Sequence, residues 1–294
     1  MRLQNMSKTS PLVSICVPSF NSACYLKATF NSLMSQTYRN IELVFVDDCS
    51  SDRSWEIARE YEPYLREKFS RVILLKNDRN QGTLRSMHNA FQHMTGDLAS
   101  YLDGDDYLEP TKVEKNVQFL CENPNFGAVH SDFNSFENSS TMTVAFWRNY
   151  VHYSDIPQGW VFEALLKSNF IQSASMMVRK ELWDRCYTFD IFEARNYKMG
   201  DYPGHLNVSQ IARIGYIDEP LVHYRIRRES MSHSADPARS SAISKAIAKV
   251  QQDARLGLLQ PLPAVMGKSR CHESFLVDGG LPANGLAGIP TTVL

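Results

Sequence analysis

Three carboxylates stand within four residues at the end of an apolar run. Residues 98–102 are followed by Asp103, Gly104, Asp105 and Asp106. Such a run is typical of a buried strand, and Gly104 allows the chain to turn sharply as it leaves the sheet. Carboxylates this close repel one another unless a positive group lies between them. We therefore expect this acidic cluster (Asp103, Asp105 and Asp106) to hold a hard divalent cation that binds a phosphate.

Two other predicted strands also end in polar residues. The apolar run 12–18 ends at Pro18 and leads to Asn21, and the run 41–48 ends in a pair of aspartates that includes Asp48. Ligands of open α/β sheets bind beyond the carboxyl ends of the strands. We therefore expect these two strand ends and the acidic cluster to share one crevice.

The elements that position these residues alternate between strand and helix. We expect strands at 12–18, 41–48, 71–75, 98–102 and 127–131. This alternation predicts an α/β fold with a doubly wound, mostly parallel sheet and helices on both faces. The rest of the chain is less regular.

In that less regular part we expect a helix at 202–215, a strand at 220–224 and a helical segment to residue 259. A polar loop or a pair of strands is expected at 133–147.

Composition excludes several classes of protein. The chain has 294 residues, 43% of them hydrophobic and 21% charged, as in ordinary soluble proteins. A net charge of -1 gives no electrostatic footprint for nucleic acid. No segment approaches the ~18 apolar residues of a membrane span, and the first ten residues lack the apolar stretch of a secretion signal. Six cysteines without CxxC spacing favour a reducing cytoplasm over a zinc site or a disulfide framework.

Together, these segments resemble the inverting family 2 glycosyltransferases of the GT-A fold. The resemblance covers roughly residues 11 to 235. It rests on the order and spacing of segments 13–21, 41–52, 80–82, 102–106 with Pro110, and 223–225. It implies a Rossmann-like sheet with a smaller acceptor-side subregion.

The same resemblance implies a division of the chain. Residues 11–132 would form the nucleotide-sugar-binding half and residues 133–235 the acceptor-binding half. Residues 1–10 would be an N-terminal extension, and 236–259 a C-terminal helical segment. For 260–294 we expect a disordered tail, because Pro and Gly recur there without periodicity.

The resemblance also implies a metal site. Asp103 and Asp105 match the acidic pair of the family's DxD motif, with Asp105 as a ligand of Mn²⁺ or Mg²⁺. Asp103 would reach either the donor's ribose or the metal. His223 stands where a third metal ligand is expected, with a hydrogen-bonded structural histidine as the other interpretation. A bound cation would stabilise the charge that builds on the departing diphosphate.

Further donor contacts follow from the same match. Asp48, with Pro18 and Asn21, would hold the base and ribose, while Asp52 either adds a contact or only caps its helix. The other implied contacts are Asn80, Gly82, Arg85 at the diphosphate, Gly104 and Arg225. Arg225, Arg227 and Arg228 are hypothesised to fold over the diphosphate.

Asp201 is the candidate general base. The family usually carries Glu-Asp before a helix in the acceptor half, and Gly200-Asp201-Tyr202 fills that place here. General bases of this kind accelerate reactions by about 10²–10⁴-fold. Other acids in this half remain open as rivals, namely Asp190, Glu193 and Asp218.

These implications give a specific expected function. The enzyme would move a sugar from a nucleotide sugar, with a UDP-sugar favoured, to a glycan or lipid-linked acceptor in bacterial polysaccharide or surface glycan biosynthesis. It would work in the cytoplasm, with peripheral membrane association left open, and without nucleic acid. The oligomeric state is left open.

The same residues bear on four other possible functions. A non-catalytic sugar-nucleotide-binding protein of this fold is the main alternative, and the acidic pair with Asp201 speaks against it. A sugar nucleotidyltransferase needs a Gly-rich basic loop after the first strand, which residues 19–22 do not supply. A dinucleotide oxidoreductase needs GxGxxG, which is absent. A processive synthase would carry membrane helices and Gln-x-x-Arg-Trp, and neither is found.

Overall fold

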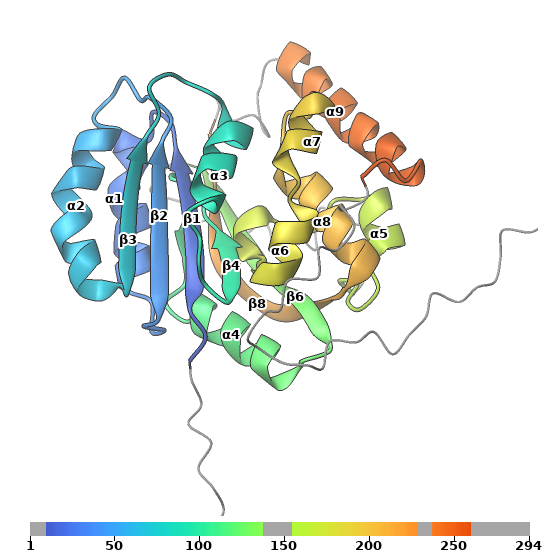
Figure 1. Ribbon diagram of the computed structural model, residues 1–294, viewed down its shortest axis with the longest axis horizontal. Helices are drawn as coiled ribbons and strands as arrows, with labels where there is room; N and C mark the ends of the chain where they lie inside the picture. Colours follow the sequence, from blue (N-terminus) through green and yellow to red (C-terminus); the bar gives the residue numbers. More distant parts are fainter. Residues whose placement is uncertain (1–9, 138–154, 228–236, 260–294) are drawn as a thin grey trace, which may run out of the picture. The chain divides into compact units, whose positions relative to one another are not determined.

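An eight-stranded mixed sheet organises the part of the chain that the computed structural model describes, residues 10–137, 155–227 and 237–259. The strands lie in the order β3-β2-β1-β4-β7-β6-β8-β5. Figure 1 shows β3, β2, β1 and β4 side by side. This arrangement confirms the α/β class predicted from the alternating strands and helices.

The first half of the sheet is parallel. It contains β3 (Arg71–Lys76), β2 (Ile41–Asp47), β1 (Val13–Ser19) and β4 (Leu98–Tyr101). In this register Ser19 lies beside Asp47, and the end of β4 lies beside the middle of β1. The carboxyl ends of β2, β1 and β4 therefore lie along one edge, as their polar endings predicted.

The second half mixes strand directions. Strand β7 (Met177–Arg179) runs antiparallel to β4 and to β6 (Phe126–Glu137), while β8 (Arg213–Ile226) runs parallel to β6 with register shifts. Strand β5 (Tyr107–Leu108) pairs with β8 in the antiparallel sense, directly after the acidic cluster.

The prediction for residues 202–215 was wrong at its carboxyl end. Helix α8 (Asp201–Ile211) stops earlier, and residues from Arg213 onward pair with β6 instead. The predicted strand at 220–224 is the later part of β8, which has 14 residues. Pairing with a neighbouring strand outweighed the helical apolar spacing that the prediction followed.

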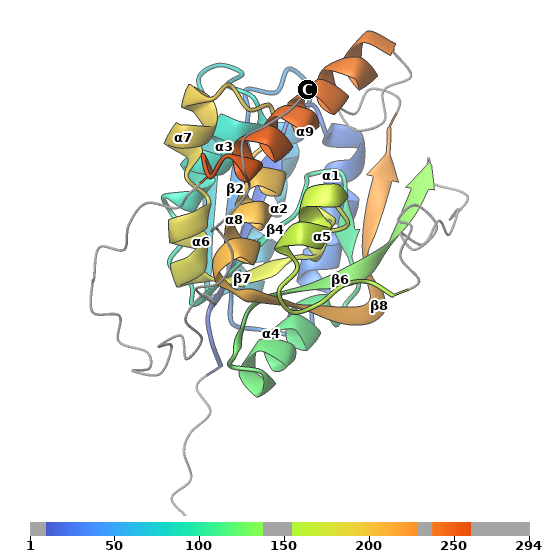
Figure 2. The same cartoon turned by 90° about the vertical axis from the view of Figure 1, so that its right-hand side faces the viewer.

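Helices cover both faces of the sheet. Helices α1 (Ala23–Met34), α2 (Ser54–Lys68) and α4 (Lys112–Glu122) pack on one face. The other face carries α3 (Thr83–Phe91), α5 (Phe162–Lys167), α6 (Lys180–Cys186), α7 (Phe189–Ala194), α8 and α9 (Pro237–Arg255), as Figure 2 shows in part. A 3₁₀ turn, η3 (Ser173–Ser175), precedes β7. Alternate residues of β1 face the two apolar layers, Val13, Ile15 and Val17 on one side and Cys16 on the other.

Some predictions lie outside the described residues. These are most of the N-terminal extension, residues 138–147 of the irregular segment, Arg228, and the tail 260–294. Within the described ranges, no helix combines the length and the apolar character that a membrane crossing requires. The predicted division into donor and acceptor halves stays a prediction.

A buried carboxylate joins the parallel strands at the edge opposite the acidic cluster. Glu42 on β2 is completely buried and accepts hydrogen bonds from the Ser14 hydroxyl at 2.6 Å and the Thr95 backbone N–H at 2.7 Å. Its second oxygen lies 2.6 Å from the Arg71 guanidinium. Burial alone would raise the pKa of Glu42, but hydrogen bonds from Ser14, Thr95 and Arg71 lower it. Glu42 therefore links three strands and the turn before β4.

We predict that Glu42→Gln lowers the free energy of unfolding by about 2–4 kcal/mol. The substitution replaces one accepting carboxylate oxygen by an NH₂ group, which would then face donors from Ser14, Thr95 or Arg71 and leave them without an acceptor. Urea denaturation at neutral pH measures this change. The pKa of Glu42 in the folded protein lies below its ordinary value, so the difference should shrink as the pH falls through that pKa. The exposed Glu60→Gln is the control and should stay within about 0.5 kcal/mol. Equal losses in both variants would contradict this assignment.

Candidate active site

The acidic cluster leaves β4 and crosses the end of β1. The Gly104 N–H donates to the Pro18 carbonyl oxygen at 3.1 Å. A Cβ on Gly104 would lie 2.9 Å from the Ser19 Cβ and 3.2 Å from that carbonyl oxygen. Close approach to β1 therefore requires glycine here and sets the cluster beside the β1 end.

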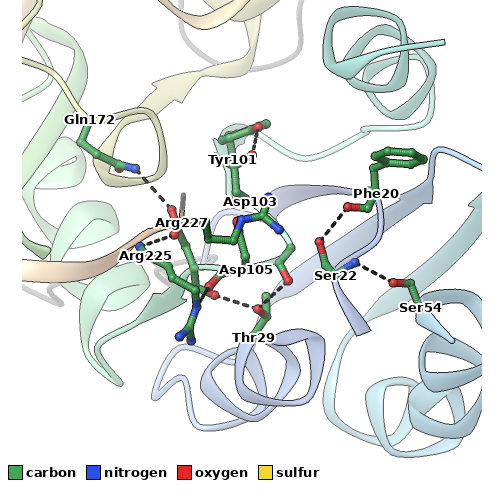
Figure 3. A network of polar contacts seen from close by, with 12 residues as sticks. Phe20, Ser22, Thr29, Ser54, Tyr101, Asp103, Asp105, Gln172, Arg225 and Arg227 are labelled. Atoms are coloured by element: carbon green, nitrogen blue, oxygen red, sulfur yellow. Dashed lines mark hydrogen bonds and ion pairs between the residues drawn. The ribbon is translucent and has the colours of Figure 1, made fainter. Parts of the chain in front are cut away.

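Each carboxylate of the cluster has its own partner (Figure 3). Asp103 accepts a hydrogen bond from the Tyr101 hydroxyl, and the Asp105 Oδ2 lies 2.7 Å from the Arg227 Nε. Asp106 is buried and accepts a hydrogen bond from the Arg225 backbone N–H at 2.8 Å. Asp106 thus attaches β8 to the loop, while Asp103 and Asp105 remain the predicted acidic pair.

The pKa values of these carboxyls show how strongly their charges oppose one another. Burial and the charge of Asp105 raise the pKa of Asp103 to about 7, and Asp201 adds to the effect. Burial also raises the pKa of Asp105, against the charge of Arg227. Burial and the other two carboxylates raise the pKa of Asp106. A positive charge placed among them would relieve this repulsion.

The donor set of the cluster fits Mn²⁺ or Mg²⁺ bound together with a phosphate. The three carboxylates of the cluster and Asp201 outnumber the two guanidinium groups that act on the cluster, Arg225 and Arg227, by two charges when all are ionised. No group of three or more His, Cys, Asp or Glu side chains in the described ranges could hold a metal by itself. One or two carboxylates completed by phosphate oxygens and water is the set that Mg²⁺ usually adopts.

Asp201 begins α8 and faces the same space. The Ser173 hydroxyl from η3 donates to Asp201 Oδ2 at 2.5 Å. Gly200 before it packs tightly, since a Cβ there would lie 2.8 Å from a methyl carbon of Leu84. The charge of Asp201 contributes to the raised pKa of Asp103, so the two carboxyls are near enough to interact electrostatically.

The three other candidates for the general base, Asp190, Glu193 and Asp218, have surroundings that differ from those of Asp201. Glu193 on α7 pairs with Arg85, and the side chain of Asp190 is 90% exposed. Asp218 accepts a hydrogen bond from the Tyr216 hydroxyl at 3.3 Å on β8. None of the three is among the charges that shift the pKa of Asp103, whereas Asp201 is.

Asp48 holds the loop that follows β3. Its carboxylate accepts hydrogen bonds at 2.8 Å from the Asn77 side chain and from the backbone N–H groups of Gln81 and Gly82. Gly82 has a φ of 83°, a region that favours glycine, and its N–H also lies 3.1 Å from Asn80 Oδ1. The structure thus gives Asp48, Asn80 and Gly82 a shared task in shaping the loop beside the β2 end.

Asn21 and Asp52 connect the ends of β1 and β2. Asn21 accepts a hydrogen bond from the Ser51 N–H at 2.9 Å. Asp52 accepts from the Ala23 N–H at 2.9 Å and from the Ser54 N–H at 2.9 Å, at the starts of α1 and α2. Asp52 therefore satisfies a backbone N–H in the first turn of each of two helices, and its predicted contact with the donor stays a prediction.

The structure engages two predicted site residues elsewhere. Arg85 lines an open pocket with Arg79, Asn80 and Gln81, but its guanidinium pairs with Glu193 on α7. The His223 Nε2 lies 2.5 Å from Glu109 Oε1, and the His223 ring stacks on Tyr107 with centroids 4.3 Å apart. These contacts agree with the structural interpretation of His223, and its role as a metal ligand stays a prediction.

Sequence reasoning missed two contacts at this site and one exposed side chain. The pairing of Arg227 with Asp105 and the hydrogen bond from Ser173 to Asp201 join residues far apart in the sequence. Phe20 at the β1 end is 44% exposed, an unusual fraction for a large apolar side chain beside polar strand ends. The position of Phe20 between Pro18 and Asn21 was the one available signal.

Comparison with known proteins identifies the family. A family model described as glycosyl transferase family 2 matches residues 14–206. Glycosyltransferase GlyA of Streptococcus pneumoniae is 27% identical over 226 residues, which is 75% of this chain and 31% of that protein. The Escherichia coli enzyme WfaP, a UDP-Glc:α-D-GlcNAc-diphosphoundecaprenol β-1,3-glucosyltransferase, is 35% identical over 109 residues, 37% of this chain and 41% of that enzyme. Both alignments span less than half of the relative's length.

Solved structures share the fold. Staphylococcus aureus TarS 1-349, solved with UDP and with UDP-GlcNAc, superposes with a TM-score of 0.58. The UDP complex is 16% identical, with 84% of this chain and 70% of that chain covered. The mannosyltransferase PcManGT from Pyrobaculum calidifontis, in complex with GDP-Man and Mn²⁺, has a TM-score of 0.57 and 15% identity, with 85% and 73% covered. The GT-A fold implied by the sequence is confirmed.

We predict that Asp103→Asn raises the free energy of unfolding of the metal-free protein by about 1–2 kcal/mol at about pH 8, because it removes an unfavourable charge. The pKa of Asp103 in the folded protein, about 7, lies above its ordinary value. Wild-type protein should therefore lose stability as the pH rises through about 7, and the variant should lose less.

Urea denaturation at about pH 5 and about pH 8 measures both curves. The exposed Asp184→Asn on α6 serves as the control. A stability difference between Asp103→Asn and wild type that does not widen with pH would contradict the prediction.

Proposed function

The chain belongs to glycosyl transferase family 2, and we propose that it transfers a sugar from a nucleoside diphosphate sugar to an acceptor hydroxyl with inversion. The observation that supports the proposal best is that Asp103 and Asp105 follow the β4 end, while Asp201, at the start of α8, lies near enough to raise the pKa of Asp103. A leaving diphosphate and an attacking hydroxyl must lie on opposite sides of the anomeric carbon. An acidic pair and a separate carboxylate suit these two tasks.

Asp105, with Asp103 beside it, would hold Mn²⁺ or Mg²⁺ and through it the diphosphate. When bound, the cation neutralises the charge that the leaving diphosphate acquires. The mannosyltransferase of similar fold was solved with GDP-Man and Mn²⁺, which supports this choice of cofactor. The β1 and β2 ends, with Asn21 and the loop that Asp48 holds, would receive the nucleoside.

Asp201 would act as the general base. The Ser173 hydroxyl donates to Oδ2 and holds the carboxylate in place, which leaves Oδ1 to accept a proton. The acceptor hydroxyl gives its proton to this oxygen as it attacks the anomeric carbon. Attack from the side opposite the diphosphate inverts the configuration of that carbon.

The acceptor is proposed to be a glycan or a lipid-linked saccharide. WfaP acts on a diphosphoundecaprenol-linked GlcNAc, and TarS binds UDP-GlcNAc, which favours a UDP-sugar and an acceptor in bacterial surface polysaccharide synthesis. A lipid-linked acceptor would place the reaction at a membrane surface. A donor-binding protein without activity is the alternative, and release of nucleoside diphosphate only when donor, Mn²⁺ and acceptor are all present would exclude it.

We predict that Asp105→Ala weakens UDP binding in Mn²⁺ by more than the roughly 10- to 100-fold typical of losing an outer-shell partner, because a metal ligand itself is lost. Isothermal titration of UDP with and without Mn²⁺ measures the effect. Asp184→Ala on the exposed surface of α6 is the matched control. Unchanged UDP affinity of Asp105→Ala in Mn²⁺ would refute the metal role.

We predict that Asp201→Asn leaves UDP affinity within about twofold of wild type and lowers the rate of transfer by about 10²–10⁴-fold, because the amide cannot accept the proton. Single-turnover transfer and UDP titration separate the two quantities. Asp190→Asn, a change to an exposed acid in the same half, should leave both unchanged. Wild-type turnover in Asp201→Asn would assign the base to another residue.

A further inference from the structure

Arg227 is paired with Asp105, the residue whose carboxylate is the proposed metal ligand. Arg227 follows β8 directly, and its Nε lies 2.7 Å from Asp105 Oδ2. Figure 3 draws the two side chains next to each other. The side chain of Asp105 is 13% exposed and that of Arg227 is 28% exposed. A cation bound through this oxygen would be brought against the positive guanidinium of Arg227, so the two compete.

The neighbouring arginine is firmly fixed. The Arg225 Nε donates to the Asp105 backbone oxygen at 2.9 Å, and its own backbone N–H donates to Asp106 at 2.8 Å. Its guanidinium carbon lies 4.5 Å from the ring centre of Tyr25 and 4.4 Å from that of Phe136. Arg225 is 7% exposed. These contacts make Arg225 part of the loop structure.

Arg227 is held in a different way. Its Nε is close to Asp105 but lacks a hydrogen-bond partner of good geometry. Its guanidinium carbon lies 5.5 Å from the Tyr25 ring centre, farther than that of Arg225. The attraction between Arg227 and Asp105 is thus electrostatic, without a directed hydrogen bond. Such a partner can leave when another cation replaces its charge.

Replacement of Arg227 by a cation at Asp105 also requires a new anion for Arg227. A divalent cation alone would displace Arg227 from Asp105 and leave a half-buried guanidinium without its anion, which costs free energy. A nucleoside diphosphate supplies a new anion at the same place, and guanidinium groups bind phosphate oxygens through paired hydrogen bonds. Exchange of partners is therefore favourable only when the cation and the diphosphate bind together.

We propose that Arg227 is an exchangeable counter-ion of Asp105 that couples metal binding to diphosphate binding. In the free protein it neutralises Asp105, and in the donor complex it contacts the diphosphate. This inference rests on the proposed function and adds a reason for the metal and the nucleotide to bind cooperatively. Couplings between binding sites typically change affinity by about 5- to 150-fold.

Isothermal titration of Mn²⁺ into the full chain, with and without saturating UDP, tests the coupling. Wild type should bind Mn²⁺ alone weakly and at least about fivefold more tightly with UDP. Arg227→Gln should bind Mn²⁺ alone at least about fivefold more tightly than wild type, and UDP should enhance that binding less. Arg227→Lys keeps the charge and should retain most of the wild-type enhancement. Arg53→Gln, at an exposed arginine paired with Glu60, is the matched control.

The outcomes separate this inference from the proposed function. Wild type that binds neither Mn²⁺ nor UDP would overturn both. Wild type that binds them cooperatively, with an equal enhancement in Arg227→Gln, would overturn the role of Arg227 alone. Thermal unfolding of each variant shows whether it is folded, which is expected because Arg227 lies outside the two apolar layers.

Discussion

Repulsion among three neighbouring carboxylates, one of them buried and two partly buried, is the constraint on which this site depends. Asp103, Asp105 and Asp106 lie in one short loop, and burial raises the pKa of each. The protein counters the repulsion with a hydroxyl, a backbone N–H and two guanidinium groups rather than by removing charge. What remains is a site with an excess of negative charge, suited to a cation that arrives with its own anionic ligand.

The parallel half of the sheet gives that site a rigid base. Strand β1 lies between β2 and β4, so their carboxyl ends meet along one edge. Gly104 lets the acidic loop contact β1 directly. At the opposite edge, buried Glu42 ties three strands together through short hydrogen bonds. The polar network around Glu42 and the acidic loop are thus at different edges of the same strands.

The second half of the chain supplies charged groups that lie near the acidic loop. Helix α8 is buried along most of its length, and the charge of its first residue, Asp201, contributes to the raised pKa of Asp103. Strand β8 carries Arg225 and ends just before Arg227, and both arginines contact the acidic loop. Because β5 pairs with β8 directly after that loop, the backbone that follows the carboxylates is joined to the strand that carries Arg225. A shift of β8 would therefore change the contacts that Arg225 and Arg227 make with Asp105.

The sequence by itself determined the parallel strands, the shared edge of their polar ends and the acidic pair. These features are local, since apolar runs, turn residues and neighbouring acids are read from adjacent positions. The sequence also placed Asp201 before a helix, although it extended that helix too far, because strand pairing of the residues after Ile211 depends on a distant partner.

The partner of each charged side chain was decided only by the tertiary structure. Arg85 pairs with Glu193, His223 contacts Glu109, and Arg227 lies against Asp105, all across long separations in the sequence. An ion pair forms between whichever opposite charges the fold brings within a few ångströms, and desolvation there sets its strength. Residue type and spacing predict that a charge is present, whereas topology selects the charge that it meets.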